Sequence, residues 1–341
     1  MDVYGNKLGF TLAAVSNYGR SLLTGYDTAI AGGYTKVMLI GDSWFRYDTI
    51  PAPIRTTLQT AEGDGGIGYR SFHSHDDGEE TRITSFSRTG SWVETVFTGN
   101  GIGLKHVHAT AAATFQIVGS FTDCKIHYRK EAGFGIWRWR IDGGGWTNVD
   151  ENAATAYATE VIASGISSAS HTVDIEWVSG TVQLFGIQMT TGTTGLVVYR
   201  CGCGGALSQH WSDIAAANWQ AALDAFAPDL VLYLIANNDH GNNINPEQTK
   251  VYVKNLIDKI NGSATAPDIA LISPAINNRA QTYTITQYAE MMYQAAREKS
   301  CGYVDGAGLF GAYNASYWSD SIHLNDTGGG LLADIITDYL A

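Results

Sequence analysis

The 341-residue sequence contains only four cysteines, and their spacing is irregular: Cys124, Cys201, Cys203 and Cys301. Because the cysteines are few and irregularly spaced, they exclude the disulfide framework of a small secreted domain and do not match a structural zinc site. We expect Cys201 and Cys203 to be a pair of small buried residues. Such sparse cysteine usage leaves the redox compartment of the protein open.

Long apolar runs and an excess of basic residues are also missing. No segment predicts a transmembrane helix, and the start lacks the basic-then-apolar pattern of a Sec signal peptide. The formal net charge of −12 argues against nucleic acid or an anionic membrane as partner, because both require a basic surface. With 45% hydrophobic and 16% charged residues, the chain is globular, and its length allows one large or two ordinary domains.

A candidate nucleophile follows the first strongly apolar run. Val37 to Ile40 predict a short strand buried on both faces, and Gly41-Asp42-Ser43 form a turn directly after it. Open α/β sheets bind their ligands at the carboxyl ends of strands, so the Ser43 hydroxyl is expected in a cleft. Taken alone, such a turn is common and carries little weight.

A candidate base lies near the other end of the chain, in Asp320-Ser321-Ile322-His323. A serine hydroxyl needs a base, usually a histidine, and a carboxylate holds that histidine in the required tautomer. Asp320 can reach Nδ1 of His323 while Nε2 faces outward. Asp326 is the expected N-cap of a final helix, which places the pair on a loop. Alone, the pattern also fits a polar surface loop.

Two further strand ends carry groups suited to binding an oxyanion. Residues 229–235 predict a buried strand that ends before Asn238, whose side-chain amide can donate a hydrogen bond. Residues 197–200 lead into a glycine cluster that contains Gly204 and Gly205, where backbone N–H groups can approach a ligand. Each stretch also fits an ordinary strand-to-helix turn.

In this order and spacing, the four stretches resemble the SGNH (GDSL-type) hydrolases over residues 34–75 and 196–341. The resemblance implies that Ser43 is the nucleophile, His323 the base and Asp320 its orienting carboxylate. It implies an oxyanion hole built from the N–H groups of Ser43 and Gly205 and the side chain of Asn238, with Gly204 as the alternative to Gly205. No metal or organic cofactor is implied.

The sequence departs from the family pattern at two positions. Trp44 replaces the usual leucine after the serine, and Ala236 replaces the first glycine of Gly-x-Asn-Asp. Neither change removes a functional group, although alanine at position 236 restricts the backbone conformations open to the turn after the third strand. Trp44 and Asp239 adjoin the predicted catalytic groups and are candidate substrate-binding residues.

Residues 196–341 alternate strands and helices, which predicts an α/β domain. The resemblance implies a flavodoxin-like, three-layer arrangement of five parallel strands in the order 2-1-3-4-5. Residues 1–33 are expected to form an irregular segment packed on this domain. Helices are predicted at Trp44–Gln59 (interrupted by Pro51 and Pro53), Ser212–Phe226, Pro246–Ile260, Thr286–Lys299 and Gly328–Leu340.

Residues 76–195 have a different pattern, with about nine short β-rich runs separated by turns. This pattern predicts a β-sandwich, of jelly-roll type, inserted between the first and second strands of the hydrolase domain. We expect both crossings between the two parts to lie at the carboxyl edge of the parallel sheet.

The predicted insert contains candidate ligand-binding side chains. Trp137 and Trp139 share one strand face, where they could stack on sugar rings or, alternatively, form core. His106 and His108 share a strand face, and residues 73–77 combine histidine with aspartate, but neither group predicts a metal site without further ligands.

These features predict a serine esterase that removes O-acetyl groups from a polysaccharide, since SGNH esterases of polysaccharide and peptidoglycan carry similar extra β-domains. The alternatives are a lipid esterase or thioesterase of the same fold, and a non-catalytic glycan-binding or structural module of a phage tail or bacterial surface. An extracellular, cell-surface or phage-particle location is favoured. The glycan, its acylated position and the oligomeric state stay open.

Overall fold

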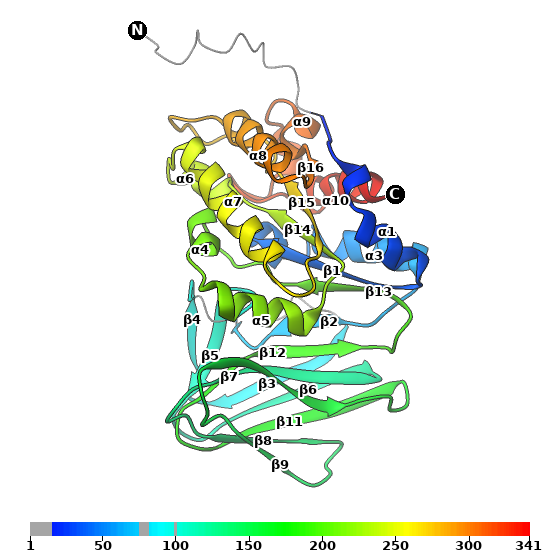
Figure 1. The fold of residues 1–341 in the computed structure, drawn as a ribbon, viewed down its shortest axis with the longest axis vertical. Coiled ribbons are helices and arrows are strands. Elements are labelled where there is room, and N and C mark those ends of the chain that lie inside the picture. Colours follow the sequence, from blue (N-terminus) through cyan, green and yellow to red (C-terminus); the bar gives the residue numbers. More distant parts are fainter. Residues whose placement is uncertain (1–15, 75–81, 99–100) are drawn as a thin grey trace.

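The computed structural model describes residues 16–74, 82–98 and 101–341. It combines a helix-covered parallel sheet with a β-rich part, which occupy the upper and lower halves of Figure 1. Among the described residues, no helix has the length and apolar character needed to cross a membrane.

Five parallel strands form the centre of the upper half, in the order β13-β1-β14-β15-β16. In chain order this is the predicted 2-1-3-4-5 arrangement, which is confirmed. The strands are β1 (Tyr34–Gly41), β13 (Gly195–Arg200), β14 (Leu230–Leu234), β15 (Asp268–Ile272) and β16 (Gly302–Val304).

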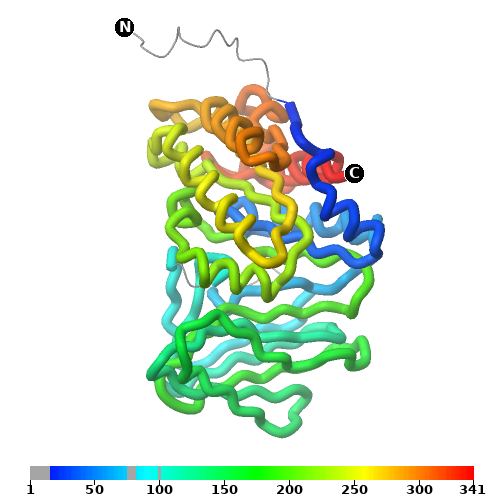
Figure 2. Tube along the Cα trace, viewed as in Figure 1, coloured from blue at the N-terminus to red at the C-terminus, as the bar shows by residue number. Residues whose placement is uncertain are grey.

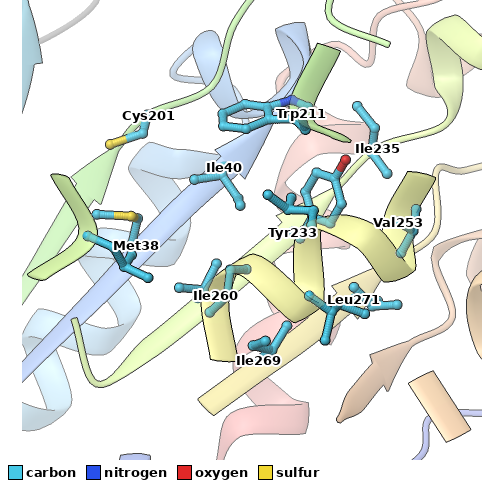
Figure 3. Close-up of a cluster of buried hydrophobic side chains, with 14 of the residues drawn as sticks. Met38, Ile40, Cys201, Trp211, Tyr233, Ile235, Val253, Ile260, Ile269 and Leu271 are labelled. Atoms are coloured by element: carbon cyan, nitrogen blue, oxygen red, sulfur yellow. The ribbon is translucent and has the colours of Figure 1, made fainter. Parts of the chain in front are cut away.

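Helices cover both faces of this sheet, which explains why its strands read as continuous apolar runs. Alternate residues of β1 enter separate cores: Met38 and Ile40 join one, and Val37 and Leu39 the other. Figure 3 shows the first core, in which Ile40 is seen between Met38 and Tyr233. Helices on the first face are α4 (Ser208–Ser212), α5 (Ala216–Phe226), α7 (Pro246–Asn261) and α8 (Ile285–Lys299), and those on the second are α1 (Thr24–Ala31), α3 (Pro51–Glu62) and α10 (Asp326–Leu340).

Three predicted helix starts need correction. Pro51 opens α3 and does not interrupt a helix, because the first turn needs no N–H from that residue. Ser212 is the last residue of α4 and not an N-cap, since the helical structure is interrupted before α5 begins at Ala216. The N-cap of α10 is Asn325, whose Oδ1 accepts the Gly328 N–H at 3.0 Å, so Asp326 is the first helical residue.

The lower half contains ten strands among its described residues, one more than predicted. The strand missed from the sequence is β9, the short second arm of a hairpin. The strands are β3 (Ile83–Gly90), β4 (Val93–Val96), β5 (Lys105–Ala109), β6 (Ala113–Phe121), β7 (Asp123–Lys130), β8 (Ile136–Ile141), β9 (Thr147–Asp150), β10 (Ala156–Ala163), β11 (Ala169–Ser179) and β12 (Val182–Thr190).

These strands belong to two sheets that share one apolar core. Strands β3-β6-β11-β8-β9 form a five-stranded sheet, while β4, β5, β7, β10 and β12 belong to an eleven-stranded sheet. Phe115 and Ile175 from the first pack in the same cluster as Ile126 and Leu184 from the second. The jelly-roll type and the predicted domain boundaries stay predictions.

The two halves are joined by a strand that the sequence analysis missed, β2 (Gly68–Ser71). It pairs in parallel with β13 and antiparallel with β12, so one sheet runs through the whole molecule. The continuous course of the chain is visible in Figure 2. Because β12 is antiparallel to β2, the chain leaves at the carboxyl edge but returns at the amino edge, before Gly195. The expectation of two crossings at the carboxyl edge was therefore wrong.

Candidate active site

Ser43 lies at the first position of the short helix α2 (Ser43–Arg46), immediately after β1. Ser43 is 5% exposed. The preceding residue, Asp42, caps α2 by accepting the Trp44 N–H at 2.9 Å. Gly41 has φ +147°, and a Cβ atom there would lie 1.8 Å from the carbonyl oxygen of Leu234 on the adjacent strand. Only glycine fits this approach, so the turn that presents Ser43 depends on it.

Ser43, His323 and Asp320 form one hydrogen-bonded chain. Ser43 Oγ lies 3.0 Å from His323 Nε2, and His323 Nδ1 lies 2.8 Å from Asp320 Oδ2. Asp320 Oδ1 accepts the N–H groups of Ile322 and His323, each at 2.7 Å. Partial burial acts to raise the pKa of Asp320, but the hydrogen bonds from His323 and the two N–H groups outweigh it and lower that pKa. The carboxylate therefore stays ionised and can orient the imidazole.

The loop that carries His323 is tied to the elements around the serine. The carbonyl oxygen of Ile322 accepts the indole N–H of Trp44 at 2.9 Å and the side-chain amide of Asn237 at 3.3 Å. Trp44 is 3% exposed and packs edge-on against Trp318, with ring centroids 5.8 Å apart. Trp44 thus helps to hold the loop that carries His323, and its predicted role in substrate binding stays a prediction.

The glycine cluster forms a tight turn beside the serine. The Ala206 N–H donates to the Cys203 carbonyl oxygen at 3.1 Å, with Gly205 in the left-handed region at φ +77°. This geometry requires glycine at the second central position of the turn. Among the described residues, the N–H groups of Ser43 and Gly205 donate to no partner. Asn238 donates one side-chain hydrogen to the Ala206 carbonyl oxygen at 3.1 Å, which ties it to the same turn.

The end of β14 leads into α6 (Asn237–Gly241) through a left-handed residue, Ala236, at φ 90°. The family glycine that Ala236 replaces would adopt this conformation without strain. Asp239 in α6 is fully buried and accepts the Ser208 N–H at 3.0 Å and the Thr249 hydroxyl at 3.1 Å. These bonds face the protein interior, so the prediction that Asp239 binds substrate was wrong.

Comparison with known proteins decides the family. The profile of the GDSL-like lipase/acylhydrolase family matches residues 142–330, more than half of the chain, including Asp320 and His323. The chain belongs to this family. This GDSL-like acylhydrolase is a carboxylic ester hydrolase. No curated protein sequence matches it significantly.

Three of the solved structures that match this chain are each under 20% identical to it in sequence. One described as "Peptidoglycan O-acetylesterase in action, 5 min" has a TM-score of 0.75 at 18% identity, covering 96% of this chain and 98% of that one. A family two carbohydrate esterase from Cellvibrio japonicus has a TM-score of 0.33 at 12% identity, covering 75% and 99%. An acetyl xylan esterase has a TM-score of 0.36 at 19% identity, covering 43% and 81%. The first of these structures shares the fold over nearly the whole GDSL-like chain.

Trp137 and Trp139 of the acylhydrolase, the two candidate sugar-binding residues, lie in β8, away from Ser43. Trp137 is fully buried in the core between the two sheets, so the prediction that it stacks on sugar was wrong. Large apolar side chains on a strand gain more from burial than from exposure. Trp139 is partly buried and donates its indole N–H to Glu160 at 3.2 Å. Its role in binding stays a prediction.

Both cysteines of the pair Cys201 and Cys203 are buried, as expected for this hydrolase. His106 is also buried and lies 2.9 Å from the Thr98 hydroxyl, and burial lowers the pKa of His106 to about 4. His73 is 3% exposed, but residues 75–77 of its motif lie outside the described residues. Within the described ranges, no group of three or more histidine, cysteine, aspartate or glutamate side chains could hold a metal ion.

Sequence reasoning missed the neighbours of His323 in this acylhydrolase. The Tyr47 ring meets the His323 ring edge-on with centroids 5.2 Å apart, and the Arg46 guanidinium lies 4.5 Å from the Tyr47 ring centre. Trp44, Tyr47, Thr49, Ile50, His323 and Leu324 line a shallow pocket of about 10 Å³. The available signal was the position of Trp44, Tyr47, Thr49 and Ile50 soon after Gly41-Asp42-Ser43, since residues that follow Ser43 lie at the same edge of the sheet.

Proposed function

We propose that this hydrolase is a serine esterase that removes O-acetyl groups from a polysaccharide or from peptidoglycan. The observation that carries the proposal is the hydrogen-bonded chain from Ser43 through His323 to Asp320, with separations of 3.0 and 2.8 Å. The chain pairs a nucleophile with a base that a carboxylate orients, as acyl transfer through an acyl-enzyme requires.

In the proposed mechanism, Ser43 Oγ attacks the ester carbonyl carbon while His323 Nε2 takes the hydroxyl proton. The N–H groups of Ser43 and Gly205 and the side chain of Asn238 donate to the oxyanion that forms. The protonated His323 then gives its proton to the departing sugar hydroxyl, which leaves acetyl on Ser43. Water, deprotonated by His323, attacks the acetyl carbonyl, and acetate leaves as Ser43 regains its proton.

Two observations support acetyl as the acyl group. At about 10 Å³, the pocket beside His323 has room for about one water molecule, so the described residues beside His323 form no preformed channel for a long acyl chain. The similar structure at a TM-score of 0.75 is described as a peptidoglycan O-acetylesterase. A lipid esterase or thioesterase would need a longer apolar channel for the acyl chain.

The first test compares p-nitrophenyl acetate with p-nitrophenyl octanoate, using Ser43→Ala as the blank. We expect hydrolysis of acetate to exceed that of octanoate and to disappear in the variant. Release of acetate from O-acetylated peptidoglycan and acetylated xylan then identifies the glycan. Preference for octanoate would support the lipid alternative. Full activity of Ser43→Ala would refute the assignment of the nucleophile, and no turnover of any ester would favour a non-catalytic glycan-binding module.

A further inference from the structure

One contact between the β-rich segment and the turn that contains Gly205 is made by a lysine at the start of β5. Lys105 is 3% exposed, and its ammonium group donates a hydrogen bond to the carbonyl oxygen of Gly202 at 2.9 Å. Just before it, Ile102 and Leu104 are fully buried in the core of the parallel sheet, in the same cluster as Cys203. This short stretch is therefore built into the hydrolase half, although it belongs to the β-rich half by sequence.

Gly202 lies between Lys105 and the helix that carries the nucleophile. A Cβ atom at position 202 would lie 2.4 Å from the Phe45 carbonyl carbon and 2.5 Å from the Arg46 nitrogen. The peptide at Gly202 thus touches the backbone of α2 on one side and receives a charged hydrogen bond on the other. A charge-assisted bond is stronger than a neutral one, and removing the donor leaves a buried carbonyl group unsatisfied.

The bond from Lys105 is the first of a series that ends at the proposed oxyanion donors. The next residue, Cys203, donates its N–H to the Gly41 carbonyl oxygen at 2.9 Å, and its own carbonyl oxygen accepts the Ala206 N–H at 3.1 Å. That second bond closes the turn containing Gly205. The Ala206 carbonyl oxygen then accepts the side-chain amide of Asn238 at 3.1 Å.

We propose that Lys105 is a positioning residue, which holds the turn at Gly202–Ala206 so that Gly205 and Asn238 converge on the oxyanion. The proposal rests on the proposed esterase function. It makes the β-rich segment a structural part of the catalytic machinery, because the oxyanion hole is incomplete without a side chain from that segment. A group that positions donors affects the transition state more than the bound ester, so kcat should fall while KM changes little.

The test measures kcat and KM for p-nitrophenyl acetate with the full chain, counting active serines with a fluorophosphonate probe. The variants are Lys105→Met, Asn238→Ala and the double variant. Lys125→Met is the matched control, because Lys125 is a partly buried lysine of β7 that lines a cavity remote from Ser43. If Lys105→Met does not fold, Lys105→Gln, which keeps an N–H donor without the charge, takes its place under the same criteria.

For Lys105→Met we expect kcat per active serine to fall about tenfold or more, short of the ~100-fold typical for removal of a direct oxyanion donor, with KM within about twofold. The double variant should be less than multiplicatively impaired, because both changes act on the same donors. A kcat equal to that of Lys125→Met, or losses that multiply fully, would overturn the positioning role alone. A wild-type chain without esterase activity would overturn the proposed function and this proposal with it.

Discussion

Replacing Ala236 by glycine should leave the stability of the protein nearly unchanged, because the relief of backbone strain offsets the losses. Ala236 has φ 90° and ψ −7°, in the left-handed region, where an L residue with a Cβ atom pays about 1–2 kcal/mol. Glycine would remove this strain but would cost about 0.5–1 kcal/mol through the larger entropy of its unfolded chain. Ala236 is also fully buried, and removal of its methyl group costs about 0.8 kcal/mol. Strain relief and the two costs nearly cancel, so the free energy of unfolding should change by less than about 1 kcal/mol.

A matched control isolates the strain from the general cost of glycine. Ala221 lies exposed within α5, so Ala221→Gly carries the same entropic cost with no strain to relieve. It should lower the free energy of unfolding by about 0.5–1 kcal/mol. The two substitutions are chemically identical, and the structure predicts a smaller loss of stability, or none, at Ala236.

The assay is equilibrium urea unfolding of the wild type and both variants, followed by tryptophan fluorescence. An Ala236→Gly protein destabilised as much as Ala221→Gly would refute the left-handed conformation or its cost. The same proteins can be assayed as esterases. We expect kcat of Ala236→Gly within about twofold of wild type, because Asn237 and Asp239 also anchor α6, through Ile322 and Ser208.

Three further predictions address the oxyanion hole and the interior. Asn238→Ala should lower kcat on p-nitrophenyl acetate about 100-fold or more while its circular dichroism spectrum stays native. Gly205→Ala should lower kcat more than Gly204→Ala does, because of the two only Gly205 has a left-handed φ, +77°. A larger loss for Gly204→Ala would point to Gly204 as the donor. Burial raises the pKa of Glu151 from 4.5 to about 9, so the folded state keeps a proton that the unfolded state releases. As the pH rises from 4.5 to about 9, the free energy of unfolding should therefore fall by up to about 1.4 kcal/mol per pH unit. Chemical unfolding at several pH values should show a shallower fall for Glu151→Gln than for the wild type.

Some predicted features were confirmed because their causes are local. Four apolar residues before Gly41-Asp42-Ser43 make a doubly buried strand wherever helices cover both faces, and β1 is such a strand. The three-residue separation of Asp320 and His323 lets one turn of chain join carboxylate and imidazole, and they lie 2.8 Å apart. Their roles in catalysis stay part of the proposal.

Other features were missed or predicted wrongly because distant contacts decide them. No strand was expected at residues 68–71, yet they form one because β12 and β13 supply partners on either side. Asp239 looked like a substrate ligand at a strand end, but Ser208 and Thr249 satisfy it from other elements. Residue type does not reveal which neighbours a side chain meets after folding.

The amino-acid sequence alone determined the apolar strands, their order along the chain and the spacing of serine, asparagine, aspartate and histidine. These depend on side-chain pattern and chain connectivity, which are written in consecutive residues. Only the tertiary structure decided that Ser43 Oγ lies 3.0 Å from His323 Nε2, across 280 residues of chain. Only it brought Lys105 to Gly202, since a contact between distant segments depends on how the whole sheet packs.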